Sequence, residues 1–288
     1  MEKLIQILLN KKGYLKKSPV YIATMLGCTE SEARDARKIA YKIYKKDNRV
    51  SSKLEISTVS NPINIINSNN VGNILVVGDL HAPFILDGYL DWVHDLSKEY
   101  KTKHTIMIGD IIDGHSWSYH ESDVDGMSVG HELEAAIKQL KLAYKLFPNA
   151  DVTLGNHDLL IARKAKTAGL SQRFIRDFRE VIDAPKTWNF GYQFKYDNVN
   201  YIHGSTGNAF TRAKESRTST VQGHLHSQAF LQYSVSEKDA IFGLQIGCGL
   251  DHNKYAFEYA KPMPKKPVIS AGLVLEGGSL PILRLMKL

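Results

Sequence analysis

Cysteine and long apolar runs are both scarce in this chain, and each shortage excludes a class of protein. Only Cys28 and Cys248 are present, which excludes a disulfide framework of the kind found in small secreted domains. No apolar run reaches the roughly 18 residues that a membrane-spanning helix needs. The stretch from Leu4 to Leu9 is too short for a signal peptide, and two lysines follow closely. We therefore expect a cytoplasmic protein with reduced thiols and no membrane contact.

Positive charge is concentrated at the N-terminus. Residues 1–50 contain 12 Lys and Arg but only 5 Asp and Glu, whereas the remaining residues contain 25 of each sign. The formal net charge of +7 therefore resides in the first sixth of the chain. An asymmetry of this kind indicates contact with a polyanion. A solvated basic face with no partner is the alternative.

The composition divides the chain into three zones. Residues 1–50 are basic and helical in pattern, residues 51–72 have the Ser- and Asn-rich composition of a linker, and residues 73–288 alternate short β-branched runs with helix-like stretches. Strands are predicted at Ile74–Val77, Thr105–Ile108 and Val152–Leu154, and amphipathic helices at Tyr89–Lys98 and Ser128–Phe147. Later strands are predicted at Phe190–Tyr196, Val199–His203, Thr220–Gln222, Phe230–Ser234, Ala240–Ile246, Val268–Leu275 and Ile282–Met286. Helices between early strands, followed by many late strands, favour an α/β sandwich.

Five short motifs end these strands or follow them directly. They are Gly78-Asp79-Leu80-His81, Gly109-Asp110-Ile111-Ile112-Asp113, Gly155-Asn156-His157-Asp158, His203-Gly204 and Gly223-His224-Leu225-His226. The i, i+2 spacing within the first and last motifs places both polar side chains of each on one face of an extended segment. Sites in open α/β sheets form at the carboxyl ends of strands, so we expect the five motifs to meet.

In order and rough spacing, the five motifs resemble those of the calcineurin-like metallophosphoesterases, over about residues 73–288. The resemblance implies a four-layer α/β/β/α sandwich, preceded here by a small all-α module, and a centre with two divalent metal ions. By motif, the first metal would be bound by Asp79, His81 and His226, the second by Asn156, His203 and His224, and both by a bridging Asp110. Histidine and carboxylate ligands without thiolates suit Mn²⁺, which we expect first, or Fe or Zn²⁺.

The same resemblance gives His157 a catalytic role. His157 follows the asparagine ligand and resembles the family residue that protonates the leaving oxygen. A free imidazole titrates at about pH 6.5, so it can supply a proton near neutrality. Asp113 and Asp158 are the candidates to orient His157, and Asp113 is favoured by its place in the second motif.

One position departs from the pattern of the protein Ser/Thr phosphatases in this superfamily. Those enzymes carry a phosphate-gripping arginine directly after the second motif, where this chain has Gly114. The difference argues against a phosphoprotein phosphatase. A phosphodiesterase, a nuclease and a nucleotidase remain open, with Arg163, Arg212 or Arg217 as candidates for the grip.

Residues 1–48 resemble a helix-turn-helix DNA-binding module. Ser18 can cap a helix that begins at Pro19 and ends at Gly27, and Thr29 with Glu32 forms a capping box for a second helix. The apolar stripe of the second helix would comprise Ala33, Ala36, Ile39, Ala40 and Ile43. Its exposed face would present Arg34, Arg37, Lys38, Lys42 and Lys45 to nucleic acid. A protein-docking hairpin and a structural cap are the alternatives.

Together these features predict a two-metal phosphoesterase that uses a metal-activated hydroxide and acts on DNA or another nucleic acid recruited by residues 1–50. The first alternative is a nucleotide or small-molecule phosphatase, or a cyclic-nucleotide phosphodiesterase, whose N-terminal module serves assembly or protein docking. The second is a DNA-binding regulator with an inactive metal domain, which the intact ligand motifs disfavour. The oligomeric state is left open.

Overall fold

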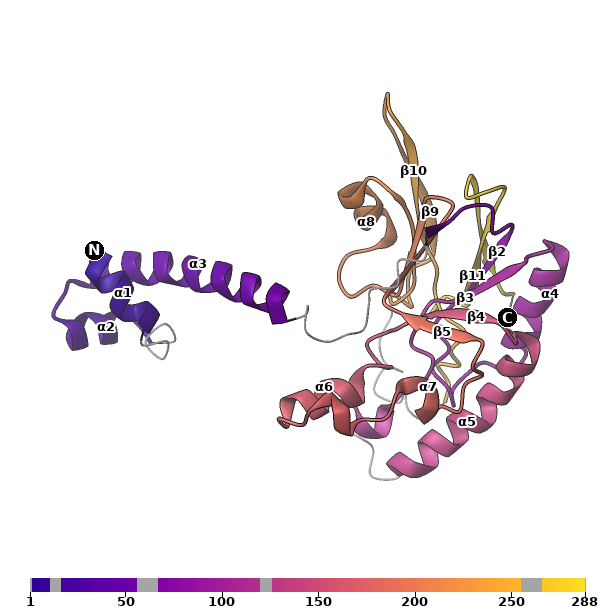
Figure 1. Cartoon of the computed structure of the whole chain (residues 1–288), viewed down its shortest axis with the longest axis horizontal. Helices are drawn as coiled ribbons and strands as arrows, with labels where there is room; N and C mark the ends of the chain where they lie inside the picture. The colour runs from indigo at the N-terminus through magenta and orange to yellow at the C-terminus, as the bar shows by residue number, and fades with distance from the viewer. Residues whose placement is uncertain (1, 11–16, 56–66, 120–125, 255–265, 288) are drawn as a thin grey trace. The chain divides into compact units, whose positions relative to one another are not determined.

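The computed structural model describes residues 2–10, 17–55, 67–119, 126–254 and 266–287 (Figure 1). The chain forms two compact units, Met1–Pro62 and Ile63–Leu288. Each unit has a hydrophobic core of its own.

Among the described residues, the N-terminal unit has three helices: α1 (Glu2–Asn10), α2 (Pro19–Leu26) and α3 (Glu30–Glu55). Small and aliphatic residues at helical spacing line the surfaces where these helices meet. The buried core comprises Leu8, Ile22, Ala33, Ala36 and Ala40. The three alanines let α1 and α2 pack closely on the first half of α3.

The ends of α2 and the start of α3 are set by local hydrogen bonds. Ser18 caps α2 by accepting a bond from the backbone N–H of Tyr21 at 3.2 Å, and Gly27 ends the helix in the left-handed conformation, with φ of 66°. At the start of α3, the Thr29 N–H donates to Glu32 Oε2 at 2.9 Å while the Glu32 N–H donates to Thr29 Oγ1 at 3.2 Å. The predicted caps are therefore confirmed.

The predicted apolar stripe of α3 is correct at its alanines and wrong at its two isoleucines. Ile39 and Ile43 are 41% and 36% exposed, whereas Ala40 is fully buried. Successive helical residues are separated by about 100° around the axis, so Ile39 is turned away from the face that Ala40 buries. The packed face is narrower than the sequence pattern predicts.

Two six-stranded sheets form the framework of the second unit. One has the order β12-β11-β2-β3-β4-β5 and the other β1-β6-β7-β8-β10-β9. The first sheet contains β2 (Ile74–Val77), β3 (His104–Met107), β4 (Ala150–Thr153), β5 (Trp188–Gly191), β11 (Ser270–Leu275) and β12 (Leu280–Leu285). The second contains β1 (Asn67–Ser68), β6 (Gln193–Tyr196), β7 (Val199–Ile202), β8 (Ser219–Gln222), β9 (Phe230–Val235) and β10 (Ala240–Gln245). Strands β2 to β5 are parallel, and so are β7 and β8.

The residues of β2 alternate between two hydrophobic cores. Leu75 and Val77 belong to the core shared with the helices, whereas Ile74 and Val76 belong to the core between the sheets. Side chains alternate across a strand, so a strand covered on both faces requires a continuous apolar run. Ile74–Val77 provides this run, and the predicted strand is confirmed at both ends.

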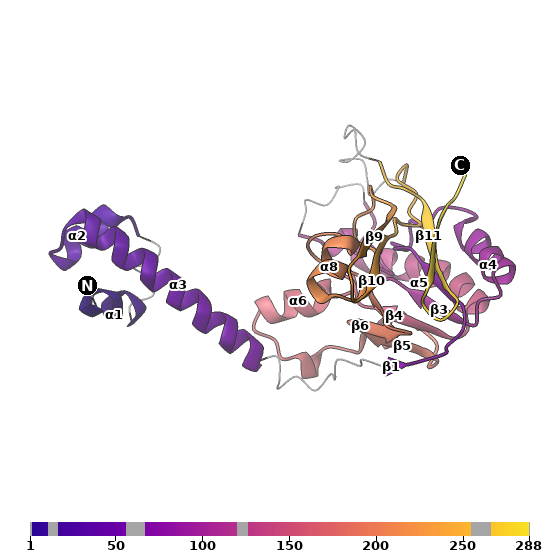
Figure 2. The same ribbon diagram turned by 90° about the horizontal axis from the view of Figure 1, so that it is seen from above.

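Helices cover the outer faces of the two sheets. α4 (Tyr89–Glu99) and α5 (Val129–Leu146) pack on the first sheet, and α8 (Ala209–Ser216) packs on the second. Figure 1 shows α8 on one side of the sheets and α4 and α5 on the other, and α8 and α4 are again on opposite sides in Figure 2. The predicted α/β/β/α sandwich is therefore confirmed. Shorter helical segments are η3 (His115–Trp117), α6 (Leu160–Thr167), η4 (Gln172–Phe174) and α7 (Phe178–Val181).

The strand predicted at Phe190–Tyr196 is two strands in different sheets. β5 ends at Gly191 and pairs with β4, whereas β6 begins at Gln193 and pairs with β7, and the chain bends at Tyr192 between them. A Cβ on Gly191 would lie 3.2 Å from the ring of Phe194, so the glycine gives this ring room at the bend. A continuous run of strand-forming residues does not reveal such a change of sheet.

The segment predicted as a linker differs from that prediction at both ends. Residues 51–55 belong to α3, and Asn67–Ser68 form β1, which pairs with β6. Residues 56–66 lie outside the described residues. Within the described part of the chain, no helix combines the length and hydropathy required to span a membrane.

We expect Gly243→Ala to destabilise the second unit. Gly243 lies on β10 beneath α8, and a Cβ there would approach the Phe210 Cα to 2.3 Å. Backbone cannot move aside cheaply, so the loss should be about 1–3 kcal/mol in the free energy of unfolding, measured by urea denaturation. Gly130→Ala in α5 is the control, since nothing lies within 4 Å of the added methyl group. Equal stability of the two variants would contradict the close approach of α8 to β10.

Candidate metal centre

The carboxyl ends of strands from both sheets meet at one site. β2, β3 and β4 lead into Asp79, Asp110 and Asn156, whereas β7 and β8 of the other sheet lead into His203 and His224. Parallel strands place their carboxyl ends at the same edge of a sheet, and packing of the two sheets brings the two edges together. The predicted meeting of the five motifs is therefore observed.

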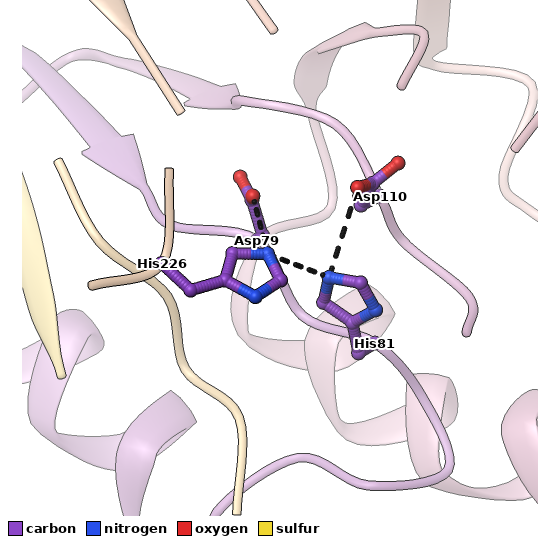
Figure 3. Close-up of side chains that lie close together, drawn as sticks. All are labelled: Asp79, His81, Asp110 and His226. Atoms are coloured by element: carbon purple, nitrogen blue, oxygen red, sulfur yellow. Dashed lines mark hydrogen bonds and ion pairs between the residues drawn. The ribbon is translucent and has the colours of Figure 1, made fainter. Parts of the chain in front are cut away.

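A first group of possible ligands consists of Asp79, His81, Asp110 and His226. His226 Nε2 lies 3.1 Å from Asp79 Oδ2 and 3.0 Å from His81 Nε2, and His81 Nε2 lies 3.7 Å from Asp110 Oδ2. Figure 3 shows the four side chains lying close together, with Asp79 and His81 on one segment and Asp110 and His226 on two others. One ligand atom from each lies within 4.8 Å of the others, as a single cation requires.

A second group consists of Asp110, His203 and His224. His203 Nε2 is 3.1 Å from Asp110 Oδ2 and 3.2 Å from His224 Nδ1. Asn156 adjoins this group, because its Oδ1 lies 3.1 Å from the same nitrogen of His203. Asp110 is common to both groups, so one carboxylate can serve two adjacent cations.

Hydrogen bonds fix the orientation of two of the histidines. His203 Nδ1 lies 2.9 Å from the Ile108 carbonyl oxygen, and His81 Nδ1 lies 2.7 Å from Asp113 Oδ1. Each Nδ1 can only donate to these oxygen partners, so in the neutral ring Nε2 keeps the free lone pair. In both histidines Nε2 is the nitrogen directed at Asp110.

Glycines provide the space that the carboxylates occupy. A Cβ on Gly155 would lie 2.1 Å from Asp110 Oδ1, and a Cβ on Gly223 would lie 2.3 Å from Asp79 Oδ1. The backbone is also strained, because His81, Asp110 and His224 all adopt positive φ, between 45° and 70°. Strain of this kind clusters at functional sites, where the surrounding fold maintains it.

The site concentrates negative charge. Burial acts to lower the pKa of His203, but the carboxylates of Asp110 and Asp79 outweigh it and raise the pKa to about 10. Burial likewise acts to raise the pKa of Asp110, but His203 and other nearby histidines lower it overall. Among the described residues, the ion pairs of Asp79, Asp110 and Asp113 involve histidine and neither lysine nor arginine.

The residues present fit divalent metal ions. Asp79 Oδ1 is buried and has no hydrogen-bond partner among the described residues, so a lone pair is available where the two groups adjoin. A buried carboxylate normally has a cation or hydrogen-bond donors around it. Imidazole nitrogens and carboxylate oxygens without thiolates are ligands that suit Mn²⁺, Fe and Zn²⁺.

Comparison with known proteins agrees with this geometry. Residues 72–248 match the family model described as calcineurin-like phosphoesterase. The chain belongs to this family. Among solved structures, a single mutant of Vps29 from Entamoeba histolytica is similar at 13% identity with a TM-score of 0.33, over 75% of this chain and 99% of that chain. No curated protein matches the chain significantly.

Family membership and the two ligand groups support a metal-dependent phosphoester hydrolase. His157 of this phosphoesterase lies beside the first group, with its ring centroid 4.7 Å from that of His81. Its backbone N–H donates to Asp110 Oδ1 at 2.8 Å, and its Nδ1 hydrogen-bonds to the Asp113 carbonyl oxygen. Burial acts to lower the pKa of His157, but Asp110 and Asp113 outweigh it and raise the pKa.

The carboxylates predicted to orient His157 have other partners. Asp113 Oδ1 is 3.9 Å from His157 Nδ1 but accepts a hydrogen bond from His81 Nδ1 at 2.7 Å, so the carboxylate orients the candidate ligand His81. Asp113 contacts His157 through its backbone carbonyl oxygen instead. Asp158 accepts bonds from the backbone N–H groups of Gly155 and Ile111, both at 2.8 Å. Asp158 therefore ties the third motif to the second. Burial, with Asp110 nearby, raises the pKa of Asp158 to about 7.

Sequence reasoning missed Glu132. This residue lies in the first turn of α5, is 1% exposed, and accepts bonds from the backbone N–H groups of His115 and Ser116, both at 2.8 Å. It thereby holds the loop that follows Asp113. An acidic residue near a helix N-terminus is usually exposed to solvent and stabilises the helix dipole, so the sequence gives no sign of this buried role.

The cations predicted to contact nucleic acid differ in availability. Arg34 pairs with Glu30 at 2.8 Å on the surface of α3, and Lys38 is exposed. Arg37 is half-buried and donates from Nη1 to the Lys17 carbonyl oxygen at 2.5 Å, so part of its guanidinium holds the N-terminal fold. The side chains of Lys42 and Lys45, also predicted to contact nucleic acid, lie outside the described residues.

We expect Asp113→Asn to weaken metal binding about 10–100-fold, because the amide no longer fixes the ring of His81 as a charged acceptor does. Calorimetric titration with Mn²⁺ measures the affinity. Glu134→Gln, an exposed change of the same chemical kind on α5, should leave it unaltered. If Asp113 acts mainly on His157, the affinity would stay constant while the pH profile of hydrolysis shifts.

Proposed function

We propose that this chain is a metal-dependent phosphodiesterase that cleaves nucleic acid. The observation that carries the chemistry is Asp110, which lies 1% exposed in both ligand groups and so can hold two cations side by side. Asp79, His81, Asp110 and His226 would hold one cation, and Asp110, Asn156, His203 and His224 the other. When bound, the two ions supply a hydroxide at neutral pH and charge neutralisation for the phosphoryl group.

His157 is the proposed general acid. Its Nδ1 is engaged with the Asp113 carbonyl oxygen, so the imidazolium form holds its transferable proton on Nε2. The side chain is 27% exposed, and His226, which is about equally exposed at 28%, is a proposed metal ligand whereas His157 is not. A group that delivers a proton to a leaving oxygen must reach the substrate, and an exposed imidazole that is not assigned to either cation suits this task.

The loop after the second motif supports a substrate other than phosphoprotein. Gly114 adopts φ of 68°, and a Cβ there would lie 2.8 Å from Trp117 Nε1. A side chain at this position would meet the buried Trp117, so the arginine of the protein phosphatases would not fit without rearrangement of η3. A residue at another position would then bind the substrate phosphate.

Two of the three arginines considered for binding the substrate phosphate lie on α8 or directly after it, and each has an acidic partner. Arg217 pairs with Asp239, and Arg212 lies 3.7 Å from Glu215. Arg163 is exposed on α6, which begins three residues after His157. Arg163 is therefore the favoured candidate of the three.

The N-terminal unit supports nucleic acid as the substrate class. Residues 1–50 hold the whole net positive charge, and α3, which follows α2 after a short turn, has Arg34 and Lys38 on its surface. A strongly basic module suits the phosphate backbone of DNA. The alternative is a nucleotide or small-molecule phosphatase, or a cyclic-nucleotide phosphodiesterase, whose N-terminal unit docks a protein.

We expect the Mn²⁺-loaded protein to hydrolyse bis-p-nitrophenyl phosphate and to cleave DNA, and Asp110→Ala to abolish both activities. Removal of the shared carboxylate takes a ligand from both groups at once. Release of nitrophenolate and gel analysis of single- and double-stranded DNA provide the measurements. Monoester hydrolysis without any DNA cleavage would favour the small-molecule alternative, and full turnover by Asp110→Ala would refute the two-metal assignment.

We expect deletion of residues 1–62 to preserve turnover of bis-p-nitrophenyl phosphate and to remove most salt-sensitive binding of duplex DNA. The second unit has its own cores, so it should fold without the first. Fluorescence anisotropy with labelled duplex at several salt concentrations measures the binding. Undiminished duplex affinity in the truncated protein would remove the role proposed for the N-terminal unit.

A further inference from the structure

A further concentration of positive charge lies within the second unit, which contains the candidate metal centre. The segment 160–179, which contains α6, η4 and the start of α7, has a single acidic residue, Asp177, among six cations. The cations are Arg163, Lys164, Lys166, Arg173, Arg176 and Arg179. Residues 51–288 are neutral overall, so this excess is hidden in the total charge. The excess is seen only when the charges of residues 160–179 are counted separately.

This basic segment is joined directly to the candidate general acid. The His157 carbonyl oxygen accepts the N–H of Leu160 at 3.1 Å, so the turn that carries His157 continues into α6. η4 in turn packs against α6, and the N–H of Leu170 donates to the Ala165 carbonyl oxygen at 2.9 Å. Figure 1 shows α6 and the chain that follows it on the side of the unit away from α4. A polymer bound along this segment would therefore extend from the catalytic site.

Exposed aromatic rings accompany the cations. Phe174 in η4 is 81% exposed, the largest exposure among the large hydrophobic residues described. Tyr119 is 57% exposed, and Lys164 Nζ and Arg163 Cζ lie 5.2 and 5.5 Å from its ring centre. A single exposed ring is common on protein surfaces, but exposed rings among cations are typical of surfaces that bind single-stranded nucleic acid. Both rings lie beside cations of the segment.

We propose that the segment 160–179, together with Tyr119, binds single-stranded nucleic acid and leads it to the metal centre. The arginines and lysines would contact successive phosphates, and the rings of Phe174 and Tyr119 would stack on bases. This combination of a basic track with exposed aromatic rings is how proteins bind single strands without reading sequence. The proposal rests on the proposed function, whose substrate it specifies as a single strand or a duplex with an unpaired end.

The aromatic rings distinguish a single strand from a duplex. Bases of an intact duplex are stacked on one another and present only their edges, so Phe174 would gain nothing from them. Arg173 has no ion-pair partner among the described residues and is exposed beside Phe174, whereas Arg176 pairs with Glu180 at 3.8 Å. Arg173 and Arg163 are therefore the cations that we expect to contribute most.

The test compares variants of the full chain, loaded with Mn²⁺, for binding to a labelled, phosphorothioate-linked thymidine oligonucleotide and to a matched duplex. Phe174→Ala should lose about tenfold in affinity for the single strand. The double variant Arg163→Gln/Arg173→Gln should weaken single-strand binding and reduce the slope of its salt dependence by about 1.4. Neither should change duplex affinity, and Phe174→Ala should also leave kcat/KM for bis-p-nitrophenyl phosphate unchanged.

Matched controls lie elsewhere on the same unit. Tyr233→Ala on β9 removes another exposed ring, and Lys138→Gln/Lys141→Gln on α5 removes two exposed cations. Equal losses in test and control variants would overturn the proposal, and so would equal losses for single strand and duplex. A change of oligomeric state in Phe174→Ala with unchanged oligonucleotide affinity would instead assign the ring to contacts between copies.

The two proposals fail separately. Wild-type protein that binds the single strand through Phe174 but cleaves no nucleic acid would refute the nuclease activity and leave this surface intact. If the wild-type protein cleaves DNA and every variant cleaves it with the same KM, the proposed binding surface is refuted and the nuclease activity stands.

Discussion

The close packing of several buried carboxylates is the constraint on which the second unit depends. Asp79, Asp110, Asp113 and Asp158 are all at most 5% exposed, and together they line the junction between the two sheets. Like charges in a buried site repel one another unless hydrogen bonds or cations offset them. Here backbone N–H groups donate hydrogen bonds to Asp158, and histidine side chains pair with the other three carboxylates. Divalent cations bound at this place would offset the charge that remains.

Much of this site could be predicted because its chemistry is local in sequence. Each motif combines a glycine with a polar residue at the end of a strand. The structure explains the pairing, since a Cβ on Gly155 or Gly223 would collide with Asp110 or Asp79. The glycine and its carboxylate lie in different motifs, so four of the five motifs depend on one another in pairs. Order and spacing together therefore indicated the site far more strongly than any single motif.

What the sequence could not predict depends on contacts between distant segments. The partner of Asp113 is decided by whether His81 or His157 is closer, and both lie more than 30 positions away along the chain. The buried role of Glu132 requires a loop folded over the first turn of α5. The change of sheet at Tyr192 also leaves the local pattern of strand-forming residues uninterrupted. In all three cases tertiary packing decides between local alternatives that are equally acceptable.

The candidate metal ligands come from both sheets, and this has a consequence for stability. Asp79 and Asp110 follow strands of one sheet, whereas His203 and His224 follow strands of the other. Any cation shared between them is a cross-link between the two halves of the sandwich, and its binding energy opposes their separation. The two sheets also share a hydrophobic core, so a bound ion would add to the stability of their packing, and its removal would lower the free energy of unfolding without separating them.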